Sequence, residues 1–194
     1  MKNKINLLPL LILTLVPALA SAQQTYSFLD KGSIYDGKTS VQETIGSLTI
    51  TATSTGGVFN SNKNNFGIVD TTIDGTAEII TLSFSQAVEI TLIDFSGIGS
   101  DVADGAKIST TTTPALSLDL HTGVPGFSGN TDIYTPDTPI RLEPGESISF
   151  TGSSDTSGFE MHSIQYNVIP EMSAQSLGTG AAGLTLVILS RLVQ

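Results

Sequence analysis

The sequence contains no cysteine and no tryptophan, and among its 194 residues are only two histidines and eight lysines or arginines. The absence of cysteine excludes disulfide bonds and cysteine-ligated zinc, so the fold must be held by core packing alone. With four tyrosines and no tryptophan, the chain has few of the flat rings on which sugars stack. The 18 acidic residues give a formal net charge of −10, which disfavours binding to nucleic acid or to anionic membrane surfaces.

Residues 1–22 have the three parts of a secretory signal peptide. Lys2 and Lys4 form a basic start, the stretch from Leu7 to Ala18 is apolar, and Ala20 and Ala22 have the small side chains that signal peptidase accepts. The apolar stretch is shorter than the ~20 residues that cross a bilayer, which argues against a retained membrane helix. We predict a signal helix that is removed by cleavage before Gln23.

The central segment, residues 23–169, has the pattern of an all-β protein. Short stretches alternate apolar and polar side chains, as strands with one buried face do, and clusters of glycine, proline, asparagine and aspartate separate them. No stretch has apolar residues at helical spacing over three turns. The residues predicted on buried strand faces are Leu48, Ile50, Ala52, Ile80, Leu82, Phe84, Val88, Ile90, Leu92, Ile148, Phe150, Ile164, Tyr166 and Val168.

Many short strands separated by turns favour a single antiparallel β-sandwich of jelly-roll type, with a barrel as the alternative. The tight link Ser85-Gln86 lies between two alternating segments, Ile79 to Phe84 and Ala87 to Phe95. We therefore predict that these two segments form an antiparallel hairpin.

The two histidines are isolated from the residues that would make them catalytic. His162 is in register with Ile164 and Tyr166, so alternation predicts that it faces the apolar side as a neutral, hydrogen-bonded imidazole. His121 follows an apolar stretch at a predicted strand end. Neither has a nucleophile or an orienting partner nearby in the sequence, so we assign no catalytic residue.

The carboxylates show no convergent pair of the kind that glycoside hydrolases use. Glu89 and Asp94 are five residues apart, an odd separation that predicts opposite faces of a regular strand. Glu143 and Glu146 flank a Pro-Gly turn and are predicted to face solvent. The sequence therefore predicts a protein that is not an enzyme.

Two ligand hypotheses stay open on the sequence alone. Structural calcium would suit two acidic segments, although neither matches the spacing of a known calcium loop, so no metal ligand or cofactor is assigned. Glycan binding would need exposed aromatic rings. The acidic segments contain Asp94, Asp101 and Asp104, and Asp70, Asp74 and Glu78; the tyrosines considered as exposed candidates are Tyr26, Tyr35 and Tyr134.

Residues 170–194 combine a short motif, an apolar stretch and a basic residue. Pro170, Glu171 and Met172 follow the last predicted strand, the stretch from Leu177 to Leu189 is apolar, and Arg191 lies beyond it. This resembles the PEP-CTERM sorting tail of bacterial exported proteins, which has a Pro-Glu-Pro motif, a short hydrophobic helix and a basic end. Two departures are Met172 in place of the second proline and a single arginine in place of a basic cluster.

The resemblance implies an exosortase, a membrane enzyme of Gram-negative bacteria that make exopolysaccharide, as the partner that recognises Pro170 and Glu171. The alternatives for the tail are a plain membrane anchor or a last buried helix. Leu177 to Val193 is 17 residues long, near the lower limit for a span. As a span, it would place Arg191 on the cytoplasmic side and the acidic domain outside.

Together these features predict an exported, non-catalytic protein of the cell surface or extracellular matrix, tethered transiently to the inner membrane. Its expected partners are signal peptidase and an exosortase-like enzyme, and nucleic acid is not among them. The alternative function is an extracellular glycan-binding module or a polysaccharide-active enzyme, with matrix polysaccharide as the partner.

Overall fold

The computed structural model describes residues 22–62, 64–70, 72–98, 105–129, 131–155 and 158–170. The predicted signal helix and the predicted C-terminal helix lie outside these residues, apart from Ala22 and Pro170. The described part of the chain contains fifteen strands and one short helix, so the protein is mostly β-structure with antiparallel sheets.

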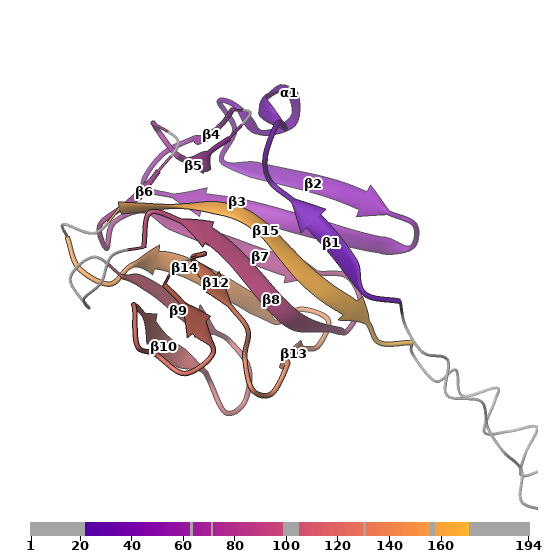
Figure 1. Cartoon of the computed structure of the whole chain (residues 1–194). Coiled ribbons are helices and arrows are strands. Elements are labelled where there is room, and N and C mark those ends of the chain that lie inside the picture. Colours follow the sequence, from indigo (N-terminus) through magenta and orange to yellow (C-terminus); the bar gives the residue numbers. More distant parts are fainter. Residues whose placement is uncertain are drawn as a thin grey trace, which may run out of the picture.

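Most strands belong to two antiparallel sheets that face each other (Figure 1). The first sheet has the order β1 (Gln24–Ser27), β15 (Gly158–Val168), β8 (Val88–Ser96), β12 (Ile133–Tyr134) and β11 (Phe127–Ser128), and β13 (Ile140–Leu142) and β6 (Ile73–Asp74) also pair with it. The second sheet has the order β10 (Ser117–Leu120), β9 (Ala106–Thr110), β14 (Ser147–Gly152), β7 (Ile79–Phe84), β3 (Leu48–Thr55) and β2 (Ser40–Ile45). The hairpin of β4 (Phe59–Ser61) and β5 (Phe66–Ile68) and the helix α1 (Gly32–Tyr35) complete the described elements.

Both sheets contribute side chains to one hydrophobic cluster. Phe84 of β7 meets Tyr166 of β15 with ring centroids 6.2 Å apart, and Phe95 of β8 meets Phe150 of β14 at 6.0 Å. The residues predicted on buried faces are buried, except Leu92 and Val168, which are partly exposed. Alternation in the sequence thus identifies the buried faces of β3, β7 and β14 correctly.

Two β-bulges in the ladder between β8 and β15 explain why Leu92 departs from the pattern. Ile90 lies opposite Tyr166 while Leu92 lies opposite Gln165, so Thr91 is an extra residue in β8. A second register shift makes His162 the extra residue in β15. Each bulge moves the alternation by one position. Beyond Thr91 the buried positions therefore belong to Ile93 and Phe95.

The predicted hairpin across Ser85-Gln86 is wrong, because the chain changes sheets there. β7 pairs with β3 and β14 in the second sheet, whereas β8 pairs with β15, β12 and β13 in the first. A hairpin within one sheet and a crossing of the chain to the other sheet both direct the two apolar faces toward the core. The local spacing of apolar residues therefore does not distinguish between these two connections. The choice is made by distant strands: β3 and β14 take both edges of β7.

Val69 lies in a strained turn after β5. Its φ of 61° is in the left-handed region, which is unfavourable for a β-branched side chain, and the N–H of Asp70 donates to the carbonyl of Ile68 at 2.7 Å across it. The side chain is 58% exposed, so burial does not offset the strain.

Replacing Val69 with glycine is expected to raise the free energy of unfolding by about 1 kcal/mol, because glycine adopts this conformation without a steric penalty. Denaturant unfolding monitored by circular dichroism measures the change. The matched control is Val58→Gly, at an exposed valine that has no positive φ, which is expected to lower stability. A Val69→Gly protein less stable than the wild type would contradict this interpretation of the turn.

Candidate functional site

Both ends of the described chain lie at the same end of the molecule. β1 runs antiparallel to the last part of β15, with Gln24 opposite Tyr166 and Ser27 opposite Ser163. The start of β1 and the end of β15 therefore lie side by side, as Figure 1 shows. We call this end, formed by residues 22–24 and 168–170, the tail pole.

Short polar contacts hold the chain up to the last residues of the tail pole. The Gln23 side-chain amide donates to Thr91 Oγ1 at 2.8 Å, and the Tyr166 hydroxyl donates to Gln24 Oε1 at 3.0 Å. On the other strand, the Ile169 N–H donates to the carbonyl of Ala87 at 2.8 Å. Pro170 has no N–H to continue this pattern, so the sheet ends immediately before the predicted sorting motif.

The predicted processing residues that the structure describes are all exposed. Ala22 and Gln23, which flank the predicted signal-peptide cleavage, are exposed, as is Pro170. The other predicted residues, which are Ala20, Glu171, Met172 and Arg191, lie outside the described residues. The tail pole thus brings together the described residues of both predicted processing sites.

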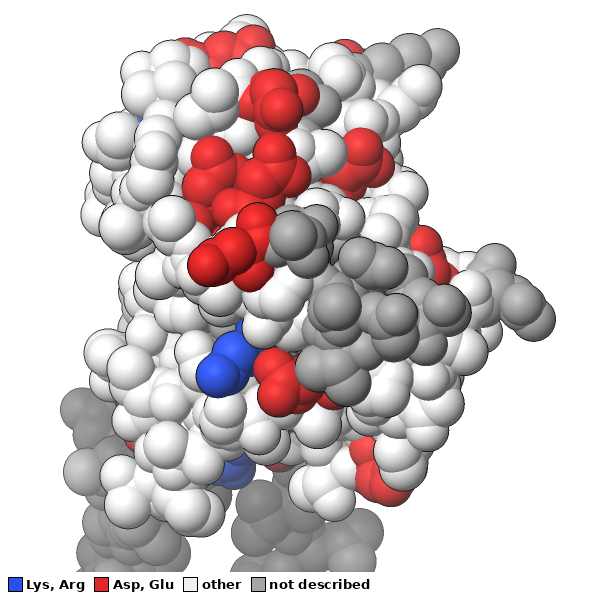
Figure 2. Space-filling model, turned by 90° about the vertical axis from the view of Figure 1, so that its left-hand side faces the viewer, with Lys and Arg blue, Asp and Glu red and all other residues white. Residues whose placement is uncertain are grey.

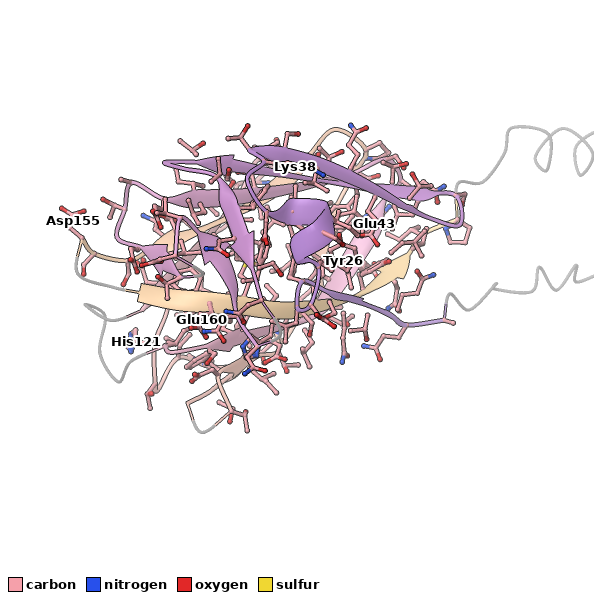
Figure 3. The ribbon with its side chains drawn as sticks, turned by 90° about the horizontal axis from the view of Figure 1, so that it is seen from above. Tyr26, Lys38, Glu43, His121, Asp155 and Glu160 are labelled. Carbon is pink, nitrogen blue, oxygen red and sulfur yellow. The ribbon has the colours of Figure 1, made fainter. Side chains whose placement is uncertain are left out.

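A polar network beside β1 joins the edges of the two sheets. The Tyr26 hydroxyl of β1 donates to Glu43 Oε2 of β2 at 2.6 Å, and Lys31 Nζ binds the same oxygen at 2.7 Å. Lys31 Nζ also lies 3.9 Å from the centroid of the Tyr26 ring. The Tyr26 and Tyr35 hydroxyls are 2.5 Å apart. Figure 3 shows Tyr26 and Glu43 close together beside α1.

The pKa shifts in this network indicate a structural role. Burial raises the pKa of Tyr26 far above its usual value and that of Tyr35 to about 12. Burial also raises the pKa of Glu43, but the hydrogen bonds from Lys31 and Tyr26 outweigh it and leave that pKa below its usual value. Since both donors already occupy one carboxylate oxygen, we interpret the network as what fixes β1 against β2.

Tyr26, Tyr35 and Tyr134, which the sequence offers as candidates for exposed rings, are buried. Their exposed fractions are 1%, 1% and 7%, because Tyr26 and Tyr35 pack into an aromatic cluster with rings from β4 and β5, and Tyr134 pairs into the first sheet. All four tyrosines and all eight phenylalanines are in fact buried. No aromatic ring is left to form a stacking surface for sugars.

His162 faces the outer side of the first sheet, so the prediction that it faces the apolar side is also wrong. The bulge at His162 turns its side chain outward between Met161 and Ile164, which are both buried. Its Nδ1 lies 3.9 Å from Asp94 Oδ1 and its Nε2 lies 4.0 Å from Glu160 Oε2. These gaps are longer than hydrogen bonds. Burial raises the pKa of Asp94, and the attraction of His162 partly offsets this.

The prediction that Glu89 and Asp94 face opposite sides is wrong for the same reason, since the bulge at Thr91 puts both on the outer face. At ~3.3 Å per residue they are still about 15 Å apart, too far for a catalytic pair. Asp94 and Glu160 are closer, on diagonal positions of the ladder. The imidazole of His162 occupies the space between them, where a hydrolase would need its sugar and water.

The remaining predicted residues have ordinary surface roles. His121 directly follows β10, as predicted, and its Nδ1 is 3.0 Å from the carbonyl of Thr122. Glu143 is exposed and Glu146 partly exposed at their turn, and Arg141 forms an ion pair with Glu143 at 2.7 Å.

Acidic side chains gather at the end of the molecule away from the tail pole, as Figure 2 shows. In this region Asp70 Oδ1 accepts a hydrogen bond from Thr72, Glu78 Oε2 accepts one from the Asp74 N–H, and Asp155 accepts one from Thr76. Within the described ranges, no group of three or more acidic or histidine side chains is arranged to hold a metal ion. Asp101 and Asp104 lie outside those ranges.

No protein-family model matches the sequence, and no curated protein matches it. Among the residues that the structure describes, no helix has the length and apolar character needed to cross a bilayer.

The buried tyrosines predict an abnormal alkaline titration. Burial raises the pKa of every tyrosine in the protein, so the folded state favours the protonated phenol. The resulting stability is fully present below about pH 10 and is lost as the pH rises through the raised values.

We expect tyrosinate absorbance of the folded protein to stay low at pH 10 and to appear together with unfolding at higher pH. The chain unfolded in guanidinium, the control, should titrate near pH 10. A folded protein whose tyrosinate absorbance also has its midpoint at about pH 10 would show that the phenols are accessible.

Proposed function

We propose that this protein is an exported, non-catalytic protein of the cell surface or extracellular matrix. Its residues 23–169 form a β-sandwich of jelly-roll type, and residues 170–194 form a sorting tail of the PEP-CTERM kind. The tail holds the protein at the inner membrane until an exosortase-like enzyme acts at Pro170, Glu171 and Met172. The observation that carries the proposal is the tail pole, where Ala22 and Pro170 emerge from one end of the domain.

The geometry of the tail pole suits a chain with an apolar segment at each end. Two segments that enter one membrane require a domain whose ends leave on the same side. The antiparallel pairing of β1 with β15 meets this requirement. All of its paired residues lie between Gln24 and Tyr166, so removal of residues before Gln23 and after Pro170 leaves the pairing intact.

The order of the strands supports the jelly-roll part of the proposal. From β7 onward the chain passes from the second sheet to the first at β8, back at β9, and crosses again before β11, before β14 and before β15. Repeated crossing between two antiparallel sheets is typical of jelly rolls.

The alternative, a glycan-binding module or polysaccharide-active enzyme, has less support. Every aromatic ring is buried, and His162 stands between Asp94 and Glu160, the pair of outer carboxylates with the closest spacing on β8 and β15. The non-catalytic proposal needs neither a stacking surface nor a carboxylate pair.

The processing step is tested by the intact mass of the protein released from the producing bacterium. The wild-type protein is expected to begin at Gln23 and to lack the stretch from Leu177 to Gln194. The double variant Pro170→Ala, Glu171→Ala is expected to stay membrane-bound with its tail uncut. Ser173→Ala, just beyond the motif, is the matched control and should be processed normally. Released wild-type protein that still carries Leu177 to Gln194 would refute processing at the motif.

A further inference from the structure

β2 is the last strand of the second sheet, and its outer edge is open. Its ladder with β3 runs through six consecutive pairs, from Ser40 opposite Thr53 to Ile45 opposite Leu48, without a register shift. In the described part of the chain no strand pairs with the other edge of β2. In Figure 1 it forms the upper border of the sheet, with α1 near its N-terminal end.

The backbone groups on that edge can be assigned from the ladder. The Ser54 N–H donates to the Thr39 carbonyl at 2.9 Å, which makes this pair one of the hydrogen-bonded pairs between the two strands. Since such pairs alternate in an antiparallel ladder, Val41, Glu43 and Ile45 bond to β3. Ser40, Gln42 and Thr44 then direct their N–H and C=O groups away from the sheet.

β2 lacks the features that normally protect an open edge, which are lysine, proline, a bulge or very short length. Ser40, Gln42 and Thr44 are exposed and uncharged. The one charged residue of the strand, Glu43, binds Lys31 and Tyr26 instead of facing the edge. The end strands of the other described edges are shorter: β1 and β10 have four residues each and β11 has two, against six in β2.

We propose that β2 is a self-association edge that pairs antiparallel with β2 of a second copy, about a two-fold axis at Gln42. This register places Gln42 opposite Gln42 of the second copy and Ser40 opposite its Thr44. All three outward-facing residues of each copy then form hydrogen bonds, and the side chains that meet are hydroxyls and amides.

A second copy fits this edge better than a charged partner. The chain has a net charge of −10, so two copies repel each other, and this repulsion is weakest where the facing surfaces carry no carboxylates. The outer edge of β2 is such a surface. A basic peptide would find no acidic side chain here, because the Glu43 carboxylate is bonded on the side of β1.

The pairing has a consequence for when the two copies meet, and this step rests on the proposed function. β2 runs toward the tail pole. Its last residue, Ile45, lies opposite Leu48, at the end of the sheet where β7 leads into β8. At the start of β8, Val88 lies opposite Val168 of the tail pole. Antiparallel pairing therefore puts the two tail poles at opposite ends of the dimer. Two copies whose tails are held in the same membrane cannot pair in this orientation. Pairing therefore follows release of the protein from the membrane, or it joins copies on two membranes that face each other.

Disulfide trapping tests the edge directly, because the chain has no cysteine of its own. Residues opposite each other in a hydrogen-bonded pair have Cα atoms about 5.5 Å apart, which is within the range for a disulfide. The full-length Gln42→Cys chain, purified in a mild detergent and oxidised, is expected to run as a covalent dimer. Thr53→Cys, exposed on the neighbouring strand β3, is the matched control and should stay monomeric. Equal cross-linking of the two variants, or none of Gln42→Cys, would overturn the proposal.

Gln42→Pro gives an independent measurement by sedimentation velocity on the same full-length chain. The Gln42 N–H points away from β3, so proline removes the intermolecular bonds and leaves the ladder within the sheet intact. The dimer dissociation constant is expected to rise about tenfold or more, because two central hydrogen bonds are lost. Circular dichroism checks that the variant is folded.

Dimerisation of Gln42→Pro equal to that of the wild type, or a wild-type chain that is monomeric at about 1 mM, would overturn the proposal. The apolar ends are the same in all variants, so they do not account for a difference between them. Cross-linking at Gln42 does not depend on tail cleavage. If the processing test fails, the cross-linking result still decides the β2 proposal, and if cross-linking fails, the mass measurement still decides the processing proposal.

Discussion

The pairing of β1 with β15 is the interaction on which the functional interpretation depends. It is a four-residue ladder, yet it fixes where both ends of the domain emerge. β1 is held on its other side by Tyr26, whose hydroxyl reaches Glu43 of β2 together with the ammonium of Lys31. The edge strands of both sheets are thus tied to each other.

The absence of cysteine and tryptophan has a visible structural consequence. With no disulfide to stabilise it, the domain places every phenylalanine and tyrosine in the core, and both sheets contribute to a single cluster. What is left for the strand surfaces is largely serine, threonine and carboxylate. A surface of this kind favours solubility over recognition of sugars by stacking.

Sequence alone predicts the regular parts of this fold and fails where distant residues decide. The buried faces of β3, β7 and β14 follow strict alternation, so the sequence predicts their buried residues correctly. The bulges at Thr91 and His162 have no local signal, because they depend on how β8 and β15 meet. They reverse the predicted orientation of His162 and bring Glu89 and Asp94 to one face. Tyr26 alternates with its neighbours over only a few residues and Tyr35 lies in a four-residue helix, so both segments are too short to predict burial.

For the candidate site, too, the sequence predicts the local features but not how distant residues are brought together. The sequence predicts cleavage before Gln23 and a motif at Pro170, but it has no signal that these positions, far apart in the chain, lie at one pole. That follows only from the register of β1 with β15. The open edge of β2 is equally invisible in the sequence, because which strand ends a sheet is a property of the whole topology.

The distance between the two ends of the domain is the direct test of a single tail pole. Cysteines introduced at Gln23 and Pro170 of the otherwise cysteine-free, full-length chain accept spin labels. The dipolar coupling between the two labels, measured by electron paramagnetic resonance, gives their separation. Because Gln23 continues the ladder opposite Asn167, we expect the Cα atoms of residues 23 and 170 to lie about 11 Å apart. A separation of about 35 Å, the length of the eleven-residue strand β15, would place the ends at opposite poles and contradict it.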